Sequence, residues 1–174
     1  MAKEIEVVII NINKQEVIKK LKSLGAKKVF EGELTDYFFD TNDSSLKKQN
    51  KYLRLRSYAS KKYVLTLKEN PISKEFKIRD EYEIEVSNIT ISKTILKSLG
   101  YEEHKKSKKY RITYEIDNVM FDIQKIKKYP YYLEIECPNK SKIISFVKKL
   151  GFTKKDLHNY SSDEIIRQYK KLKK

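Results

Sequence analysis

The 174-residue chain contains little of the residue types on which many sites depend: one cysteine, two histidines and four glycines. A single cysteine, Cys137, excludes an internal disulfide. With only His104 and His158 beside it, a zinc site of the Cys/His type is disfavoured. Three of the glycines follow helical patterns, and no Gly-rich loop of the Walker or Rossmann type is present. Any bound metal is therefore expected to be a hard cation held by carboxylates, Mg²⁺ or Mn²⁺.

Long apolar runs are also absent. No stretch approaches the ~18 residues that a membrane helix needs, and the apolar residues 7–10 are too few for a signal peptide. Hydrophobic residues make up 39% and charged residues 36% of the chain, which is typical of one soluble globular domain with a core. We expect a single domain over residues 1–166, a basic tail over 167–174, a cytoplasmic location and no membrane partner.

The formal net charge is +15, which favours polyanionic partners. Lysine supplies most of this charge, and it is spread along the whole chain rather than gathered in one stripe. The chain is also rich in Ile, Asn and Tyr, a combination that an AT-rich genome tends to produce. Polyanion attraction in general is therefore expected, while specific nucleic-acid binding is disfavoured.

Three segments with helical spacing of their apolar residues end in the same way. Gly25, Gly100 and Gly151 each stand where a helix is expected to stop in a left-handed cap. A last helix is predicted to start at Ser161, because its spacing to Glu164 fits a capping box.

Alternation of charged and apolar residues predicts a series of strands between these helices. Asp117-Asn118 fits a tight hairpin turn, and most strands follow one another through short turns, so the sheet is expected to be mainly antiparallel. An α+β domain with a large curved or closed sheet fits best, and a closed barrel could turn its charged faces inward around a wet tunnel. The predicted strands lie near residues 3–12, 34–40, 51–58, 62–69, 76–86, 107–116, 119–125 and 131–137.

Charges of one sign recur at every second position of these strands, and the sign changes from strand to strand. Residues i and i+2 of a strand share a face, and like charges side by side on a water-facing strand repel each other. A solvated sheet face explains any single strand, but such faces ordinarily mix both signs. Acidic pairs suit a divalent metal and basic pairs a polyanion, so together they predict a metal-assisted site for a phosphate chain. The groups are Glu4 and Glu6; Arg54 and Arg56; Glu81, Glu83 and Glu85; Lys109 and Arg111; and Glu134 and Glu136.

The order of these pieces resembles the CYTH superfamily, the triphosphate tunnel metalloenzymes. This group includes class IV adenylyl cyclases, thiamine triphosphatases, inorganic tripolyphosphatases and fungal RNA triphosphatases. The layout is most similar to the class IV adenylyl cyclase-like and thiamine triphosphatase-like branch. The resemblance implies an eight-stranded antiparallel closed barrel with helices packed outside. It rests on Glu4-Ile5-Glu6, Phe39-Asp40-Thr41, Leu53-Arg54-Leu55-Arg56, Leu65-Thr66-Leu67-Lys68, Lys109-Tyr110-Arg111, Phe121-Asp122, Leu133-Glu134-Ile135-Glu136 and Asn159-Tyr160-Ser161.

The resemblance also implies site residues, with Mg²⁺ or Mn²⁺ as the cofactor. The implied catalytic residues are Glu4, Glu6, Lys68 and Arg111. The implied phosphate-binding residues are Arg54, Arg56, Lys68, Lys109 and Arg111. The implied metal ligands are Glu4, Glu6, Glu134 and Glu136, while Glu81, Glu83, Glu85 and Asp122 would bind a second metal or position water.

The implied partner is a nucleoside or inorganic triphosphate, and the protein is expected to be a monomer or a homodimer. Conversion of ATP to cyclic AMP and pyrophosphate is the first functional hypothesis. Hydrolysis of tripolyphosphate or thiamine triphosphate is the second, and a catalytically weak binder of triphosphate or polyphosphate is the third.

Two positions depart from the family pattern. The opening motif of the family is Glu-x-Glu-x-Lys, and Val8 stands at the lysine position. The tyrosine that works with this lysine to activate water is replaced by Phe38, and the neighbouring Tyr37 is expected to point to the other face of its strand. The departures put efficient hydrolysis in doubt and favour cyclisation, which does not need the water-activating pair.

Overall fold

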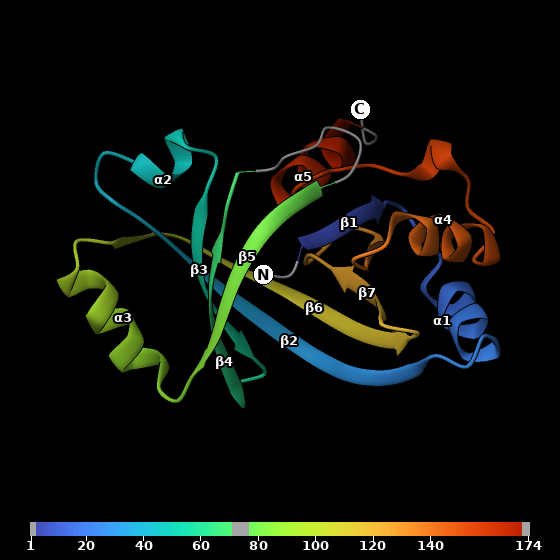
Figure 1. Ribbon diagram of the computed structural model, residues 1–174, viewed down its shortest axis with the longest axis horizontal. Coiled ribbons are helices and arrows are strands. Elements are labelled where there is room, and N and C mark those ends of the chain that lie inside the picture. The colour runs from blue at the N-terminus through green and yellow to red at the C-terminus, as the bar shows by residue number, and fades with distance from the viewer. Residues whose placement is uncertain (1–2, 71–76, 172–174) are drawn as a thin grey trace. The chain divides into compact units, whose positions relative to one another are not determined.

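The computed structural model describes residues 3–70 and 77–171, without the side chains of residues 3, 4 and 77. These residues form eight strands whose order closes into a barrel, β1-β5-β4-β3-β2-β6-β7-β8, as the resemblance implied. The strands are β1 (Lys3–Ile9), β2 (Lys27–Asp40), β3 (Tyr52–Tyr58), β4 (Lys62–Lys68), β5 (Lys77–Val86), β6 (Glu102–Ile116), β7 (Val119–Lys125) and β8 (Tyr131–Glu136). The helices are α1 (Lys14–Ser23), α2 (Ser45–Lys48), α3 (Ile89–Ser98), α4 (Lys140–Lys149) and α5 (Ser162–Lys171), with a 3-10 turn η1 at Lys154–Asp156 (Figure 1).

The chain divides into two compact units. The first unit consists of Met1–Lys3, Gly32–Ile72 and Arg79–Lys109, and therefore contains β3, β4, most of β5, and α2 and α3. The second unit consists of Glu4–Glu31, Ser73–Ile78 and Tyr110–Lys174. Strands β2 and β6 contribute residues to both units.

In the first unit, one face of the strands is apolar and is covered by α3. Phe39, Leu53 and Leu55 are buried in a cluster with Leu96 of α3. Because successive strand residues point to opposite faces, the residues between them lie on the other side of the sheet. We call that other side the first polar face; it carries Asp36, Phe38, Tyr52, Arg54, Arg56, Thr66, Lys68, Arg79, Glu81, Glu83 and Glu85.

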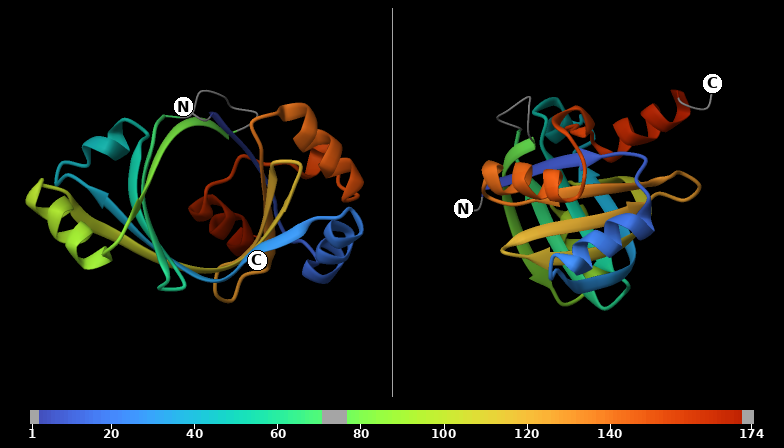
Figure 2. Two further views of the ribbon diagram at one scale, coloured as in Figure 1. Left: turned by 60° about the horizontal axis from the view of Figure 1, so that its bottom comes forward. Right: turned by 90° about the vertical axis from the view of Figure 1, so that its right-hand side faces the viewer.

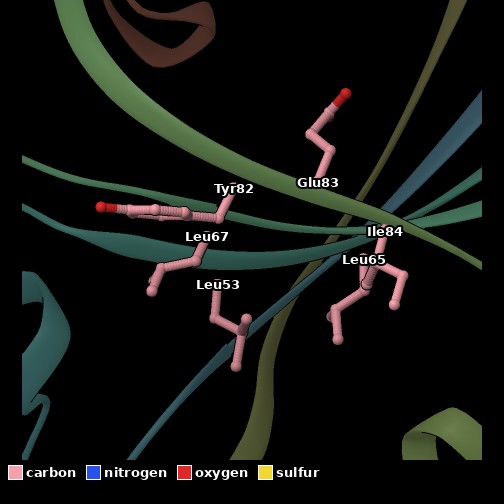
Figure 3. Close-up of a pocket in the computed structure, with 6 residues that line it drawn as sticks. All are labelled: Leu53, Leu65, Leu67, Tyr82, Glu83 and Ile84. Carbon is pink, nitrogen blue, oxygen red and sulfur yellow. The ribbon is translucent and has the colours of Figure 1, made fainter. Parts of the chain in front are cut away.

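The apolar side of the first unit has a hollow of about 230 Å³. Figure 3 shows how the two faces separate on β5: Glu83 points away from the leucines, while Ile84 points the same way as Leu65. Apolar walls do not suit a phosphate chain, which needs charged or hydrogen-bonding partners when it leaves water. The polar face is therefore the better place to look for a site. The hollow is lined by Leu53, Leu65, Leu67, Tyr82, Glu83 and Ile84.

The core of the second unit lies between its strands and the helices α1 and α4. Val7 of β1 and Phe121 of β7 are buried with Leu21 of α1 and Phe146 of α4, and the two phenylalanine rings meet edge to face with centroids 5.3 Å apart. Figure 2 shows α1 and α4 together on this side of the second unit's strands. The opposite side, which we call the second polar face, carries Glu6, Val8, Arg111, Thr113, Asp122, Gln124, Tyr132, Glu134 and Glu136.

The predicted helix ends are confirmed. Gly25, Gly100 and Gly151 all have positive φ, between +82° and +88°, directly after α1, α3 and α4. Ser161 and Glu164 form the predicted capping box: the Ser161 amide donates to the Glu164 carboxylate over 2.7 Å, and the Glu164 amide donates to Ser161 Oγ over 3.3 Å.

The Gly100→Ala variant is expected to lower the free energy of unfolding by about 1–2 kcal/mol, because an L-residue is strained in the left-handed region. The φ of Gly100 is +86°, and an added Cβ would meet no atom within 4 Å, so backbone strain is the whole of the expected effect. Urea unfolding of the variant measures it, with Ser98→Ala at the end of the same helix as the control. A Gly100→Ala protein as stable as wild type would contradict the strain argument.

Several boundaries differ from the prediction. β2 begins at Lys27 rather than near residue 34, and β6 begins at Glu102 rather than near 107. The predicted Asp117-Asn118 turn is confirmed, with φ of +53° and +60°. Helix α5 runs to Lys171, and the domain boundary at 166 stays a prediction. No helix among the described residues is long and apolar enough to cross a membrane.

The short helix α2 is a further difference, because the sequence pattern gave no sign of it. The Asp40 carboxylate accepts hydrogen bonds from the backbone amides of Leu46 and Lys47 over 2.9 and 3.0 Å, and from that of Thr41. Burial raises the pKa of Asp40, but the hydrogen bonds from these three backbone amides lower it by more, so the net shift of this pKa is downward. The Asp40-Thr41 motif therefore organises the loop that leads to β3.

Candidate functional site

The most buried ion pair of the first polar face joins Arg56 of β3 to Asp36 of β2. Arg56 Nε lies 2.6 Å and Nη2 3.0 Å from the two carboxylate oxygens, and both side chains are only 5% exposed. Burial by itself raises the pKa of Asp36, but the charge and hydrogen bonds of Arg56 outweigh it and hold this pKa well below its usual range. Arg56 is therefore fixed as a cation by a carboxylate that the sequence patterns did not single out.

Arg54 and Lys68 lie on the same face and meet the carboxylates of β5. Arg54 Nη2 lies 3.5 Å from Glu83 and 3.7 Å from Glu81, and Lys68 Nζ lies 2.6 Å from Glu81. Thr66 Oγ1 donates to Glu83 over 2.7 Å. Burial raises the pKa of Glu83, but this hydrogen bond and the nearby charges outweigh burial and lower it. The register of β3, β4 and β5 thus places the cations of β3 and β4 beside the carboxylates of β5.

The cations of the first polar face are largely shielded from water. Arg54 and Lys68 are 7% exposed. Lys109 of β6, whose charge helps to lower the pKa of Asp36 on this face, is 9% exposed. Charges held in place in a region of low dielectric interact strongly with an added charge and need little reorganisation. Glu85 lies at the edge of this arrangement, because it pairs over 3.1 Å with Lys62 and both side chains are more than half exposed.

The second polar face is organised around Arg111 of β6. Arg111 Nη1 lies 2.6 Å from Asp122, and its Nη2 lies 3.6 Å from Glu134. Gln124 accepts a hydrogen bond from Arg111 and donates one to Glu134, while Thr113 Oγ1 donates to Asp122 over 2.6 Å. This network fixes one cation between two of the carboxylates that the resemblance implied as metal ligands.

Carboxylates of three adjacent strands share the second polar face. Glu6 of β1 is the register partner of Glu136 of β8, and Asp122 of β7 is the partner of Glu134. Like charges directly opposite each other destabilise a sheet unless a cation joins them. Their oxygen donors suit Mg²⁺ or Mn²⁺.

No three carboxylate, histidine or cysteine side chains come together as a ready metal-binding group within the part of the chain that the structure describes. The side chain of Glu4, an implied ligand on β1, lies outside the described residues. The carboxylate oxygens of the second polar face fit a hard divalent cation in their chemistry. Because no ready group of three is found, the metal assignment stays a proposal.

The departure at Val8 has a structural explanation. Val8 is fully buried in a cluster with Tyr132 of β8 and with Ile165 and Tyr169 of α5. Its backbone also bridges to His158, with N–O distances of 2.8 and 2.9 Å. Helix α5 thus covers the position where the family pattern has a lysine.

The departure at Phe38 is also clear from the register. Phe38 is the partner of Arg54 and shares its face. Tyr37 points to the other face, as predicted, where it packs in the cluster under α3 and Lys93 Nζ lies 3.2 Å from its ring centroid.

The sequence patterns did not single out several residues of the two polar faces, among them Asp36, Arg79, Thr113 and Gln124. Three of these four stand two positions from a residue that was singled out, so strand periodicity could have found them. Arg79 precedes Glu81, Thr113 follows Arg111, and Gln124 follows Asp122. Thr113 and Gln124 are neutral and contributed nothing to the pattern of charge signs.

Comparison with known proteins finds relatives that span nearly the whole chain. A Methanocaldococcus jannaschii protein named "putative adenylate cyclase" is 27% identical over 170 residues, which cover 95% of this chain and 94% of that relative. A Pyrococcus horikoshii structure is 27% identical with a TM-score of 0.77, covering 93% of this chain and 98% of its own.

Two further structures support the fold alone. A Vibrio parahaemolyticus protein, also named a "putative adenylate cyclase", has a TM-score of 0.84 at 17% identity, with 95% and 98% of the two chains covered. A Hippeastrum protein described as a "putative adenylyl cyclase" with a dominant triphosphatase activity has a TM-score of 0.66 at 18% identity, with 97% and 96% covered.

The family model for the CYTH domain matches residues 2–169. The chain therefore belongs to the CYTH domain family.

Proposed function

We propose that this protein is a metal-dependent enzyme that acts on triphosphates, and that its reaction is the conversion of ATP to cyclic AMP and pyrophosphate. The observation that carries the proposal is the set of buried cations on the first polar face, Arg54, Arg56, Lys68 and Lys109. A triphosphate carries several negative charges, and cations that are already in place stabilise the transition state of phosphoryl transfer.

Three of these four cations are held in position by carboxylates. Arg56 is held by Asp36 and Lys68 by Glu81, while Arg54 reaches both Glu81 and Glu83. The carboxylates keep the cations from repelling one another when no substrate is bound. Arginine forks suit bidentate contact with phosphate oxygens, so these residues would neutralise the charge that develops on the pyrophosphate leaving group.

The carboxylates of the second polar face would hold the divalent cation: Glu6, Asp122, Glu134 and Glu136. When bound, such a cation would activate a hydroxyl group as a nucleophile. Arg111 orients Asp122 and Glu134 through its contacts of 2.6 and 3.6 Å. In the reaction the 3′-hydroxyl loses its proton to water and its oxygen bonds to the α-phosphorus, while the bond from that phosphorus to the bridging oxygen of the leaving pyrophosphate breaks.

The burial of Val8 under α5 favours cyclisation over hydrolysis. Cyclisation uses the hydroxyl of the substrate as its nucleophile and needs no residue to activate water. The name of the M. jannaschii relative supports the same reaction. Hydrolysis of a triphosphate is the second candidate, and the activity described for the Hippeastrum protein is what favours it.

The identity of the phosphorus-containing products tests the proposal. Purified protein is incubated with ATP and tripolyphosphate and with Mg²⁺ or Mn²⁺, and the mixture is followed by ³¹P NMR. Pyrophosphate together with a cyclic phosphodiester signal is the expected result. Orthophosphate with loss of tripolyphosphate would replace cyclisation by hydrolysis, and broadened substrate lines without any product would make the protein a binder.

Val8→Lys restores the family motif, yet it is expected to destabilise the protein rather than create a hydrolase. Val8 is fully buried against Ile165 and Tyr169, and forcing a longer side chain into this packed cluster lowers the free energy of unfolding by about 1–3 kcal/mol. Urea unfolding measures the loss, with Val29→Lys as the control because Val29 is 50% exposed. A Val8→Lys protein of wild-type stability that hydrolyses tripolyphosphate would contradict this reading of α5.

A further inference from the structure

Two aromatic rings at one end of the first polar face each have a cationic side chain over them. The guanidinium of Arg79 lies 5.6 Å from the ring centroid of Tyr52, and Lys105 Nζ lies 5.5 Å from that of Phe38. The two rings contact each other edge to face, with centroids 5.9 Å apart. Tyr52 is the register partner of Lys68, so this end of the face adjoins the cations already described.

Arg79 differs from its neighbours in how it is held. Lys68 and Arg54 lie against carboxylates, whereas no carboxylate among the described residues pairs with Arg79, whose recorded contact is the ring of Tyr52. Its Nε is buried and donates no hydrogen bond within the described structure, a state that it shares with the Nε of Arg54. A buried donor without an acceptor is costly, which indicates a group supplied by a ligand.

The position of Arg79 extends the row of cations by one step. Arg56 and Arg54 are two residues apart on β3, and Tyr52 is the next residue of β3 on the same face. Lys68 of β4 is opposite Tyr52, and Glu81 of β5 is opposite Lys68. Arg79 stands two residues before Glu81 on the same face, and two residues of a strand span about 6.6 Å. The row therefore continues past the residues proposed to hold a triphosphate.

We infer that Arg79, positioned by the ring of Tyr52, forms an anion subsite that takes a phosphate beyond the third of a polyphosphate chain. Lys105, positioned by Phe38, supplies the second cation of this subsite. The inference rests on the proposed function. It also gives Phe38 a role that needs no hydroxyl, because an aromatic face attracts a cation electrostatically.

Calorimetric titration with tripolyphosphate, tetrapolyphosphate and ATP, each with Mg²⁺, tests the subsite. Wild type is expected to bind tetrapolyphosphate about tenfold more tightly than tripolyphosphate, the effect of one charge-assisted contact. Arg79→Gln is expected to remove this preference while keeping tripolyphosphate binding within about twofold. Lys106→Gln is the matched control, because Lys106 lies 5.2 Å from the ring of Tyr37 on the other face; it should change neither affinity.

Tyr52 variants give a second readout that does not depend on Arg79→Gln folding well. Tyr52→Phe keeps the ring and should keep the preference for tetrapolyphosphate, whereas Tyr52→Leu should lose it. Equal loss of all three ligands in Arg79→Gln, or a loss confined to ATP, would overturn the phosphate subsite. Wild type that binds tripolyphosphate but shows no preference overturns the subsite alone, and wild type that binds none of the ligands overturns the proposed function with it.

Discussion

The Arg54→Ala variant is expected to turn over its triphosphate substrate about 10²–10³ times more slowly than wild type, the usual consequence of removing one preorganised group that stabilises charge in the transition state. Arg54 is buried, and it reaches Glu81 and Glu83. Without the arginine, these two carboxylates would face the substrate phosphates with one cation fewer between them. The effect should therefore fall mainly on kcat rather than on KM.

Steady-state kinetics of Arg54→Ala and of a matched control measure this effect. Lys62→Ala removes a lysine from the next strand that is more than half exposed and pairs with Glu85. The control should retain turnover within about twofold, since an exposed charge is well screened. If Arg54→Ala keeps wild-type turnover and an intact circular dichroism spectrum, Arg54 is not part of the site.

Replacing Asp36 by asparagine is expected to lower the free energy of unfolding by about 3–5 kcal/mol, because it leaves the buried charge of Arg56 without its partner. The two side chains meet through two hydrogen bonds of 2.6 and 3.0 Å. Glu33→Gln is the control, because Glu33 and Lys108 form an exposed pair, and such pairs contribute about 0–1 kcal/mol. Equal losses from both variants in urea unfolding would show that the buried pair contributes no more to the free energy of unfolding than the exposed pair.

The same pair gives the wild-type protein a dependence on acid. The pKa of Asp36 is lowered in the folded protein from an ordinary value of 3.8, so its contribution to stability is fully present above that value. The contribution is lost as the pH falls from there toward the folded pKa. Unfolding measured between neutral pH and strong acid should show a decline that is smaller in Asp36→Asn, and identical pH profiles would contradict the linkage.

Local signals in the sequence predicted the local structure well. Three glycines marked three helix ends, the spacing of Ser161 and Glu164 marked a capping box, and Asp117-Asn118 marked a hairpin. Each of these features depends on a few neighbouring residues, so nothing distant could override it. The alternation of charge also placed Arg54, Glu83 and Glu134 correctly on polar strand faces, because side-chain direction follows from strand periodicity alone.

Features that depend on distant segments were missed. Asp36 pairs with Arg56 only because the register of β2 and β3 places them opposite each other. Val8 is buried by Ile165 and Tyr169, which follow it by about 160 residues, so its loss of the motif lysine could be noticed in the sequence but not explained there. The end of the first polar face where Arg79 meets Tyr52 likewise required the pairing of β3, β4 and β5.

Calorimetric titration of tripolyphosphate with Mg²⁺ into wild type, Lys68→Gln and Lys62→Gln tests most directly whether the buried cations of the first polar face form the site. Lys68 and Lys62 stand on the same strand and the same face, but Lys68 is buried against Glu81 and Lys62 is exposed. We expect saturable binding to wild type and to Lys62→Gln, and at least a tenfold weaker affinity for Lys68→Gln. Equal affinity for all three proteins would show that triphosphate binds elsewhere and would contradict the account.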